Sequence, residues 1–492
     1  IAMYWTMHYG PGVSPDSTIY IETARSLTQG NGFTVRGKPM THYPPGYPLL
    51  LSWARTLQKG DILKGGRLLG AILFGFNVIL FGIAIQISTE HSLLATITAI
   101  FFFLSSVPII SLHAMAWSEA PFIFFSLAVF ILLIFYIKQP TPYLLISASL
   151  MSSFAIATRY VGVTLLPPMA LAILLLSEKP MKHRVKDTII YLVVASLPLA
   201  IWLVRNIMTA QTATNRTLAV HPFGLSHAKS LISTIYNFVL PVNISVWTKV
   251  FHFGIAASLL VLAVKILQKE SGSLRNIKPT KIVFPFLGLV FFYTYISFLI
   301  ISISFFDAHT PLDFRILAPP FLTLTAGVVC IVWLVAKRIK QENIWFSFLL
   351  FALLSISINM NGAVSKVIDI HEYGLGYTSR YWQKSERMSY LLTLSNTKKI
   401  FSNGSALIRF ASDHKTAMIP RKIFPGTRQL NKEYEEQLNQ MFLECRKGNA
   451  MLVYLKHFRR RWYLPSLKEI QYRGNLPVLR KFNDGIIFGR QG

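Results

Sequence analysis

The side chains best suited to chemistry are a few acids and arginines in a strongly apolar chain. They are Asp16 in SPDSTIYIETARSL (14–27), Glu119 in LHAMAWSEAPF, Arg159 in IATRYVGV, Arg205 in IWLVRNIMTA and Arg315 in TPLDFRILAPP. The planar guanidinium of arginine matches the oxygens of a phosphate, and a carboxylate can take the proton of an attacking hydroxyl. These residue types together predict group transfer from a lipid-embedded phosphate donor to a hydroxyl or amine.

Four more polar residues accompany this set. They are His42 and Tyr43 in THYPPGYPLLL, His113 shortly before the second acid, and Asp313 shortly before the last arginine. Histidine and tyrosine bring hydrogen-bonding groups that can line a substrate entrance, and an acid beside an arginine can orient it. We therefore count these four as candidate substrate-binding residues.

Simpler structural roles are open to several of these residues. Arg159 or Arg205 can extend its side chain to lipid headgroups, and Glu119 can cap the helix that begins at Ala120. Asp313 and its neighbouring arginine can form a local pair. The shared location argues for a common site, because charged groups at membrane depth are costly and tend to face a cavity or a partner.

Composition indicates a polytopic membrane protein. Of 492 residues, 52% are hydrophobic and only 14% are charged, and the apolar residues form long runs such as 93–112 and 121–137. A membrane-spanning helix needs ~20 mostly apolar residues. The formal net charge of +28 fits basic cytoplasmic loops better than nucleic-acid binding, since no nucleic-acid-binding motif accompanies it.

Ten apolar segments predict helices, preceded by the end of a truncated first span in IAMYWTMHY, about 11 transmembrane helices in all. The ten lie at about 66–87, 93–112, 117–137, 143–158, 160–176, 188–208, 250–266, 282–305, 316–336 and 343–360. If loop 10–65 is extracytoplasmic, the basic loops 177–187, 265–281 and 336–343 are cytoplasmic, as the positive-inside rule demands. Merging 143–158 with 160–176 would reverse them, so we expect two short spans. The candidate acids and arginines then face the outer side.

The tail has a different character. We predict a transmembrane catalytic domain over 1–360 and a small mixed α/β extracytoplasmic domain over 361–492. The runs AMLVYLK (450–456) and GIIFGR (485–490) predict strands, FNDGII predicts a hairpin turn, and 431–448 predicts an amphipathic helix. Asn431 is the expected cap of that helix, and Gly448 follows its end.

Several motifs together resemble a known family. They are SPDSTIYIETARSLTQGNGF and THYPPGYPLLLSW in the first loop, AMAWSEAPFI, ATRYVGVTLLP, LPLAIWLVRN, TPLDFRILAPP, and KIFSNGSALIRF in the tail. In this order the chain resembles the GT-C membrane glycosyltransferases that use lipid-linked sugars, the class of protein O-mannosyltransferases and aminoarabinose transferases. The resemblance covers nearly the whole chain and implies their helical fold, with the periplasmic domain that bacterial members carry.

The resemblance also implies roles for the candidate residues. It makes Asp16 the general base and Arg159, Arg205 and Arg315 the contacts of the donor phosphate. Many members carry two adjacent acids in the first loop, whereas Ser17 follows here, so Glu119 is the expected substitute. His113 or Glu119 would orient the sugar, Asp313 would support substrate binding, and His42 and Tyr43 would line the acceptor entrance.

The expected reaction is inverting hexosyl or pentosyl transfer from a polyprenyl-phosphate sugar to a lipid, glycan or protein acceptor. The expected setting is a bacterial plasma membrane, with membrane lipids and no nucleic acid as partners. A divalent cation, Mg²⁺ or Mn²⁺, beside Asp16, His42 or Glu119 is compatible with these residues, although no ligand spacing requires it. Two alternatives stay open: a polytopic transporter, and an inactive subunit of a membrane assembly.

Overall fold

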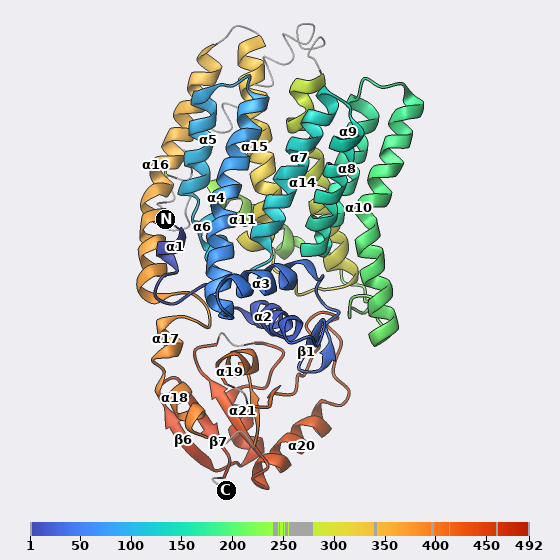
Figure 1. Cartoon of the computed structure of the whole chain (residues 1–492). Coiled ribbons are helices and arrows are strands. Elements are labelled where there is room, and N and C mark those ends of the chain that lie inside the picture. The colour runs from blue at the N-terminus through green and yellow to red at the C-terminus, as the bar shows by residue number, and fades with distance from the viewer. Residues whose placement is uncertain are drawn as a thin grey trace.

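The computed structural model describes residues 2–239, 245, 247–248, 250, 254, 279–338, 342–394, 398–412, 414–458 and 461–490. Figure 1 shows a bundle of long helices with a small sheet domain at its lower end, in orange and red. Two short helices, in blue, lie across the bundle between these two parts. The protein is therefore a helical membrane bundle that carries a compact α/β unit.

Six helices in the described part of the chain are long and apolar enough to cross a membrane, or seven if a bent pair forms one span. The six are α4 (Ile62–Ser88), α7 (Glu119–Lys138), α10 (Met181–Ala210), α14 (Pro279–Phe305), α15 (Phe314–Arg338) and α16 (Glu342–Tyr373). The bent pair is α5 (Leu93–Ser105) and α6 (Val107–His113), which meet at 67°. These helices cover seven of the ten expected segments. The expected segment 250–266 lies outside the described residues, apart from residues 250 and 254.

Two expected short spans are separate elements. Helix α8 (Pro142–Thr158) ends at Arg159, whose extended backbone interrupts the helical path before the 3₁₀ turn η1 (Tyr160–Leu165) and α9 (Leu166–Leu176). Pro167 and Pro168 lie in the first turn of α9, where a proline needs no hydrogen-bond partner for its nitrogen. The prolines therefore begin a helix and do not kink one.

The bundle buries some helices and exposes others as a lipid-facing protein should. Of the six long helices, α7 is the most enclosed, since 72% of its most apolar stretch is buried inside the protein. The corresponding share for α10 is only 22%. Apolar side chains of α10 such as Val193 and Ile201 are more than half exposed. Close helix packing uses small residues, since a Cβ on Gly288 of α14 would lie 2.5 Å from the Thr323 carbonyl oxygen of α15.

The first loop folds into structure at the lower end of the bundle. After α1 (Ala2–Trp5), helix α2 (Pro15–Thr28) starts at Ser14, whose hydroxyl accepts a hydrogen bond from the Ser17 amide. A two-stranded ribbon follows, β1 (Thr34–Val35) with β2 (Lys38–Pro39), and then α3 (Gly46–Leu57). The helix expected over 14–27 is confirmed. Helix α11 (Leu225–Val239) packs beside α15.

The C-terminal domain contains a five-stranded mixed sheet with strand order β4-β3-β5-β7-β6. Its strands are β3 (Lys399–Ser402), β4 (Thr416–Met418), β5 (Ala450–Leu455), β6 (Val478–Phe482) and β7 (Gly485–Phe488). Its helices are α17 (Arg380–Gln383), α18 (Glu386–Thr393), α19 (Ser405–Ala411), α20 (Tyr434–Arg446) and α21 (Leu467–Gly474). Strand β3 pairs in parallel with β4 and β5, and β7 pairs antiparallel with β5 and β6. Leu438 and Phe442 of α20 pack with Leu452 in the core of the sheet.

The strands, the hairpin and the helix expected in the tail are all present, with two differences in detail. Helix α16 continues through residues 360 and 361 to Tyr373, because charged residues beyond the apolar run do not interrupt a helix that has left the membrane. The N-cap of α20 is Glu433, so the expected cap was wrong. Asn431 instead accepts a hydrogen bond from the Glu433 amide, two residues along the chain.

Candidate active site

The site is built around Asp16, which lies in the first turn of α2. Pro15 opens the helix, and the positive end of the helix dipole favours a carboxylate in this turn. The chain just before α2 is held on both sides, because Gly12 pairs with Met115 and Val13 pairs with Gly376. The backbone therefore fixes where the carboxylate begins.

Two neighbours hold the carboxylate of Asp16. The Tyr43 hydroxyl donates to Oδ1 at 2.7 Å, and Arg315 Nη1 donates to Oδ2 at 2.6 Å. The guanidinium of Arg315 lies 4.4 Å from the ring centre of Trp117, which is a cation–π contact. The side chain of Asp16 is 30% exposed, so a substrate can reach it.

The second acid continues the same network toward the membrane. Glu119, at the start of α7, is fully buried, and its Oε1 accepts from Arg315 Nε at 2.5 Å. The same oxygen forms an ion pair with Arg159 Nη1, while Oε2 has no hydrogen-bond partner among the described residues. Acids and arginines therefore alternate in one row, in which neighbouring charges compensate each other. The row consists of Asp16 from α2, Arg315 from α15, Glu119 from α7 and Arg159 at the end of α8.

The first-loop part of the site has shifted pKa values. Burial acts to raise the pKa of Asp16, but the Arg315 charge and the hydrogen bonds from Tyr43 and Arg315 outweigh it, and the pKa lies below 3.8. Burial, and then the nearby Asp16 charge, raise the pKa of the Tyr43 hydroxyl well above 10.0. Burial and the Arg216 charge lower the pKa of His42. At neutral pH Asp16 is therefore an ionised acceptor paired with the Arg315 cation, and Tyr43 beside it is neutral.

The remaining predicted residues lie outside this row. Arg205 Nη1 donates to the Met40 carbonyl at 2.9 Å, and its guanidinium lies 4.7 Å from the Trp202 ring. Arg205 therefore holds the loop around β2. Its contacts among the described residues do not include any member of the row. His42 packs edge-on against the Tyr43 ring, with the ring centres 4.7 Å apart, beside the site.

Two predicted residues have mainly structural contacts. His113 is buried, with Nε2 2.9 Å from the Asn77 amide nitrogen, and that amide also donates to the Ala120 carbonyl. It supports the start of α7 from behind the second acid. Asp313 accepts hydrogen bonds from the amides of Arg315 and Ile316, so it caps α15 and orients the arginine.

Sequence analysis did not single out three residues that contact the row or each other beside it, namely Tyr20, Trp117 and Ser118. The Tyr20 hydroxyl lies 3.4 Å from Ser118 Oγ, which also accepts from Arg159 Nη1 at 3.4 Å, and Trp117 lies under Arg315. Tyr20 is four residues after Asp16, on the same face of α2. Its spacing, and the position of WS directly before the second acid, are the signals that could have revealed them.

The donor atoms do not favour a metal ion. Among the described residues no three His, Cys, Asp or Glu side chains cluster as ligands would. Both acids of the row are already paired with Arg315, which carries the positive charge a cation would otherwise bring. We therefore derive no step through a metal.

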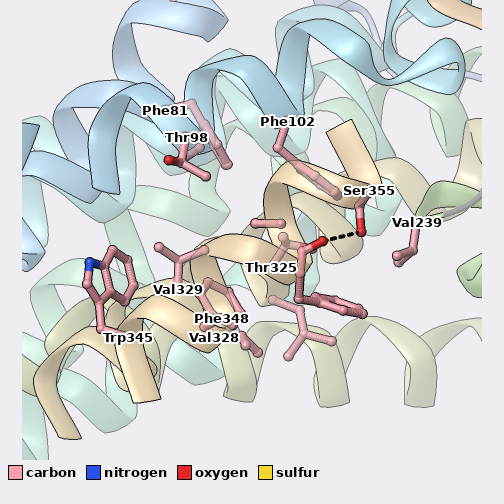
Figure 2. A pocket seen from close by; sticks show the side chains of 14 residues that line it. Phe81, Thr98, Phe102, Val239, Thr325, Val328, Val329, Trp345, Phe348 and Ser355 are labelled. Carbon is pink, nitrogen blue, oxygen red and sulfur yellow. Dashed lines mark hydrogen bonds between the residues drawn. The ribbon is translucent and has the colours of Figure 1, made fainter. Parts of the chain in front are cut away.

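An apolar cavity of about 210 Å³ lies elsewhere in the bundle. Figure 2 shows side chains around it that include Phe81, Phe102, Val329 and Trp345, and no described lining residue is charged. Trp345 lies near the start of α16, which follows the end of α15, whereas Arg315 lies at the start of α15. The cavity is therefore displaced toward the opposite end of the bundle from the charged row.

Sequence comparisons identify no relative, since no family model matches the chain and no curated protein matches it. Comparison with solved structures finds a shared fold. The structure of ArnT from Cupriavidus metallidurans bound to undecaprenyl phosphate matches with a TM-score of 0.56 and 12% identity, over 99% of this chain and 95% of that one. The chain therefore shares the fold of ArnT, which is the GT-C fold. The same ArnT in the apo state matches with a TM-score of 0.57, 13% identity and the same coverage.

The GT-C fold confirms the expected helical membrane bundle with a small C-terminal sheet domain, whereas the expected number of about 11 transmembrane helices stays a prediction. It extends over nearly the whole chain, so the helical bundle and the sheet domain belong to one architecture. The low identity means that residue roles must come from the chemistry of this chain. That chemistry is the row of acids and arginines next to α2.

Proposed function

We propose that the protein is a glycosyltransferase that moves a sugar from a polyprenyl-phosphate donor to a hydroxyl or amine acceptor. The observation that carries the proposal is the pairing of an accessible carboxylate, Asp16, with a guanidinium, Arg315, at one end of a GT-C bundle. The ArnT structure with undecaprenyl phosphate supports the donor class. We therefore assign the acid to the acceptor and the arginines to the phosphate.

The proposed step is a single displacement with inversion. The acceptor oxygen or nitrogen attacks the anomeric carbon while Asp16 takes its proton, and the bond from that carbon to the phosphate oxygen breaks. The polyprenyl phosphate leaves as an anion with the electron pair of that bond. Arg315 and Arg159 supply positive charge where the negative charge develops, in a largely desolvated place where it acts strongly.

The surrounding residues have supporting roles. Tyr43 orients the Asp16 carboxylate through its hydroxyl. Glu119 pairs with both Arg315 and Arg159 and so holds the two guanidinium groups close together. We assign His42 to the acceptor entrance because its ring lies beside Tyr43. Arg205, on α10, supports the site from outside the row, because it holds the first loop through the Met40 carbonyl. His113 and Asp313 act on the site through the helix starts that they support.

The setting follows from the same geometry. The site and the sheet domain lie at one end of the bundle (Figure 1). The basic segment 177–187, which includes the start of α10, lies at the other end, where α15 ends and α16 begins. By the positive-inside rule we propose that the site lies on the extracytoplasmic face, and we take the membrane to be a bacterial plasma membrane. A donor with a long lipid chain can reach the row sideways from the outer leaflet.

The test uses membranes with a panel of undecaprenyl-phosphate-linked sugars, radiolabelled aminoarabinose and mannose among them. A glycosyltransferase releases free undecaprenyl phosphate, and Asp16→Asn abolishes that release. Asp61→Asn is the matched control, because Asp61 caps α4 and pairs with Lys64, which is not part of the acid row. A transporter would move labelled material without releasing the lipid phosphate, and an inactive subunit would do neither.

A further inference from the structure

The mechanism leaves one acid of the first loop without a role. Glu22 lies on α2, beyond Asp16, and its side chain is only 15% exposed. Its Oε1 forms an ion pair with Nε of Arg409 at 3.1 Å, and its Oε2 lies 3.9 Å from Nε of Arg36. Arg409 belongs to α19 of the C-terminal domain. The ion pair therefore joins two regions that are separated by nearly the whole chain.

The same arginine reaches the first turn of α2. Arg409 Nη2 donates to Thr18 Oγ1 at 3.2 Å, and the Thr18 hydroxyl donates to the Pro15 carbonyl at 2.7 Å. Pro15 is the residue before Asp16. A short path of polar contacts thus runs from α19 to the backbone next to the proposed base.

A second connection holds the chain just before α2. The Tyr377 amide donates to the Val13 carbonyl at 2.8 Å, and Thr378 Oγ1 donates to the Pro11 carbonyl at 2.9 Å. Gly376 has φ of +57°, and a Cβ there would collide with the Val13 carbonyl. The segment between α16 and α17 therefore lies tightly against the entry to α2, where only glycine fits.

These contacts have a common geometric consequence. The N-terminal end of α2 touches the 376–378 segment, and its next turns touch α19. Arg36 adds a third link, since its Nη1 donates to the His414 carbonyl at 3.2 Å. Arginine suits such a link, because its planar fork can bind a carboxylate and a hydroxyl at once. Figure 1 shows α19 directly below α2.

We propose that Arg409 is a positioning residue and that the C-terminal domain holds the Asp16 helix in its working place through Glu22 and Thr18. This rests on the proposed role of Asp16 as the base. The domain then has a task inside the reaction cycle besides any binding of its own. A displacement of α2 by about 1 Å changes the distance from Asp16 to the acceptor, and misplacements of this size cost up to about 100-fold in rate.

The experiment compares Arg409→Gln, Arg409→Lys and the charge exchange Glu22→Arg with Arg409→Glu in the full-length membrane protein. Arg409→Gln should lower kcat for release of undecaprenyl phosphate about 10- to 100-fold, with little change in KM for the donor. Arg409→Lys keeps the charge, so its kcat should lie between those of Arg409→Gln and the wild type. The double variant with exchanged charges should have a higher kcat than Glu22→Arg or Arg409→Glu alone. Arg473→Gln, which breaks an ion pair with Glu435 elsewhere in the same domain, should leave kcat unchanged.

Hydrogen exchange supplies a second readout that does not depend on the reaction. Amides of α2 should exchange severalfold faster in Arg409→Gln than in the wild type, and Arg473→Gln should leave them unchanged. Wild-type kcat with unchanged exchange in Arg409→Gln would overturn the proposal. Faster exchange in Arg409→Gln together with full activity of Asp16→Asn would support Arg409 as a positioning residue but reject Asp16 as the base. The two proposals can therefore fail separately.

Discussion

Replacing Glu119 by Gln should expose how much the buried row depends on charge balance. Glu119 is fully buried and is the carboxylate partner of both Arg159 and Arg315. After the change Arg315 keeps Asp16, but Arg159, with 14% of its side chain exposed, has no carboxylate left among the described residues. Breaking one side of a buried ion pair costs about 3–5 kcal/mol. We expect a loss in this range in the free energy of unfolding.

The assay is reversible unfolding of the purified protein in mixed detergent micelles, followed by circular dichroism. The structure also offers a rescue, because Glu119→Gln combined with Arg159→Gln removes the stranded cation together with its partner. That double variant should recover most of the lost stability while it stays inactive. Glu435→Gln, on the exposed surface of α20, serves as the control for removing an acid. A Glu119→Gln protein as stable as the wild type, or a double variant less stable than the single one, would refute the reasoning.

Three further outcomes follow from the first loop and the sheet domain. Tyr43→Phe removes the hydrogen bond to Asp16, so kcat for lipid-phosphate release should fall about 10- to 100-fold, and an unchanged kcat would exclude Tyr43 from orienting the base. Because the pKa of Asp16 lies below 3.8, its carboxylate is ionised at neutral pH. The acid limb of the pH–rate profile should therefore lie below that value. The stability that this carboxylate contributes to the folded protein should be lost as the pH falls through the lowered pKa. Tyr472 is 90% exposed and both cysteines are buried, so in spheroplasts a membrane-impermeant maleimide should label Tyr472→Cys and not the wild type; labelling only after lysis would reverse the proposed orientation.

The sequence was informative where the membrane imposes simple rules. Long apolar runs predicted the helices, and the sign of the loop charges placed Asp16, Glu119, Arg159 and Arg315 on one side. The structure brings these four side chains into one row. The helix over 14–27 was predictable too, because Ser14 and Pro15 are strong start signals for a helix.

Contacts that depend on the rotation of a helix about its axis were not predictable. Arg205 ends the same kind of apolar run as Arg159, yet its turn of α10 faces the β2 loop. His113 precedes Glu119 by little, but α6 turns its ring inward to Asn77. Hydropathy carries no information on which way such residues point. The link from α19 to Glu22 was hidden for another reason, since no local pattern shows which distant charges will meet.

The most direct test measures binding of the released lipid phosphate and turnover side by side in the wild type and in Asp16→Asn. Binding is followed by isothermal titration of undecaprenyl phosphate into the purified protein, and turnover by release of that lipid phosphate from the labelled donor that the wild type accepts. The account predicts nearly equal affinity in both proteins, because Arg315 and Arg159 remain, and no turnover in the variant. Turnover at the wild-type rate in Asp16→Asn would contradict it.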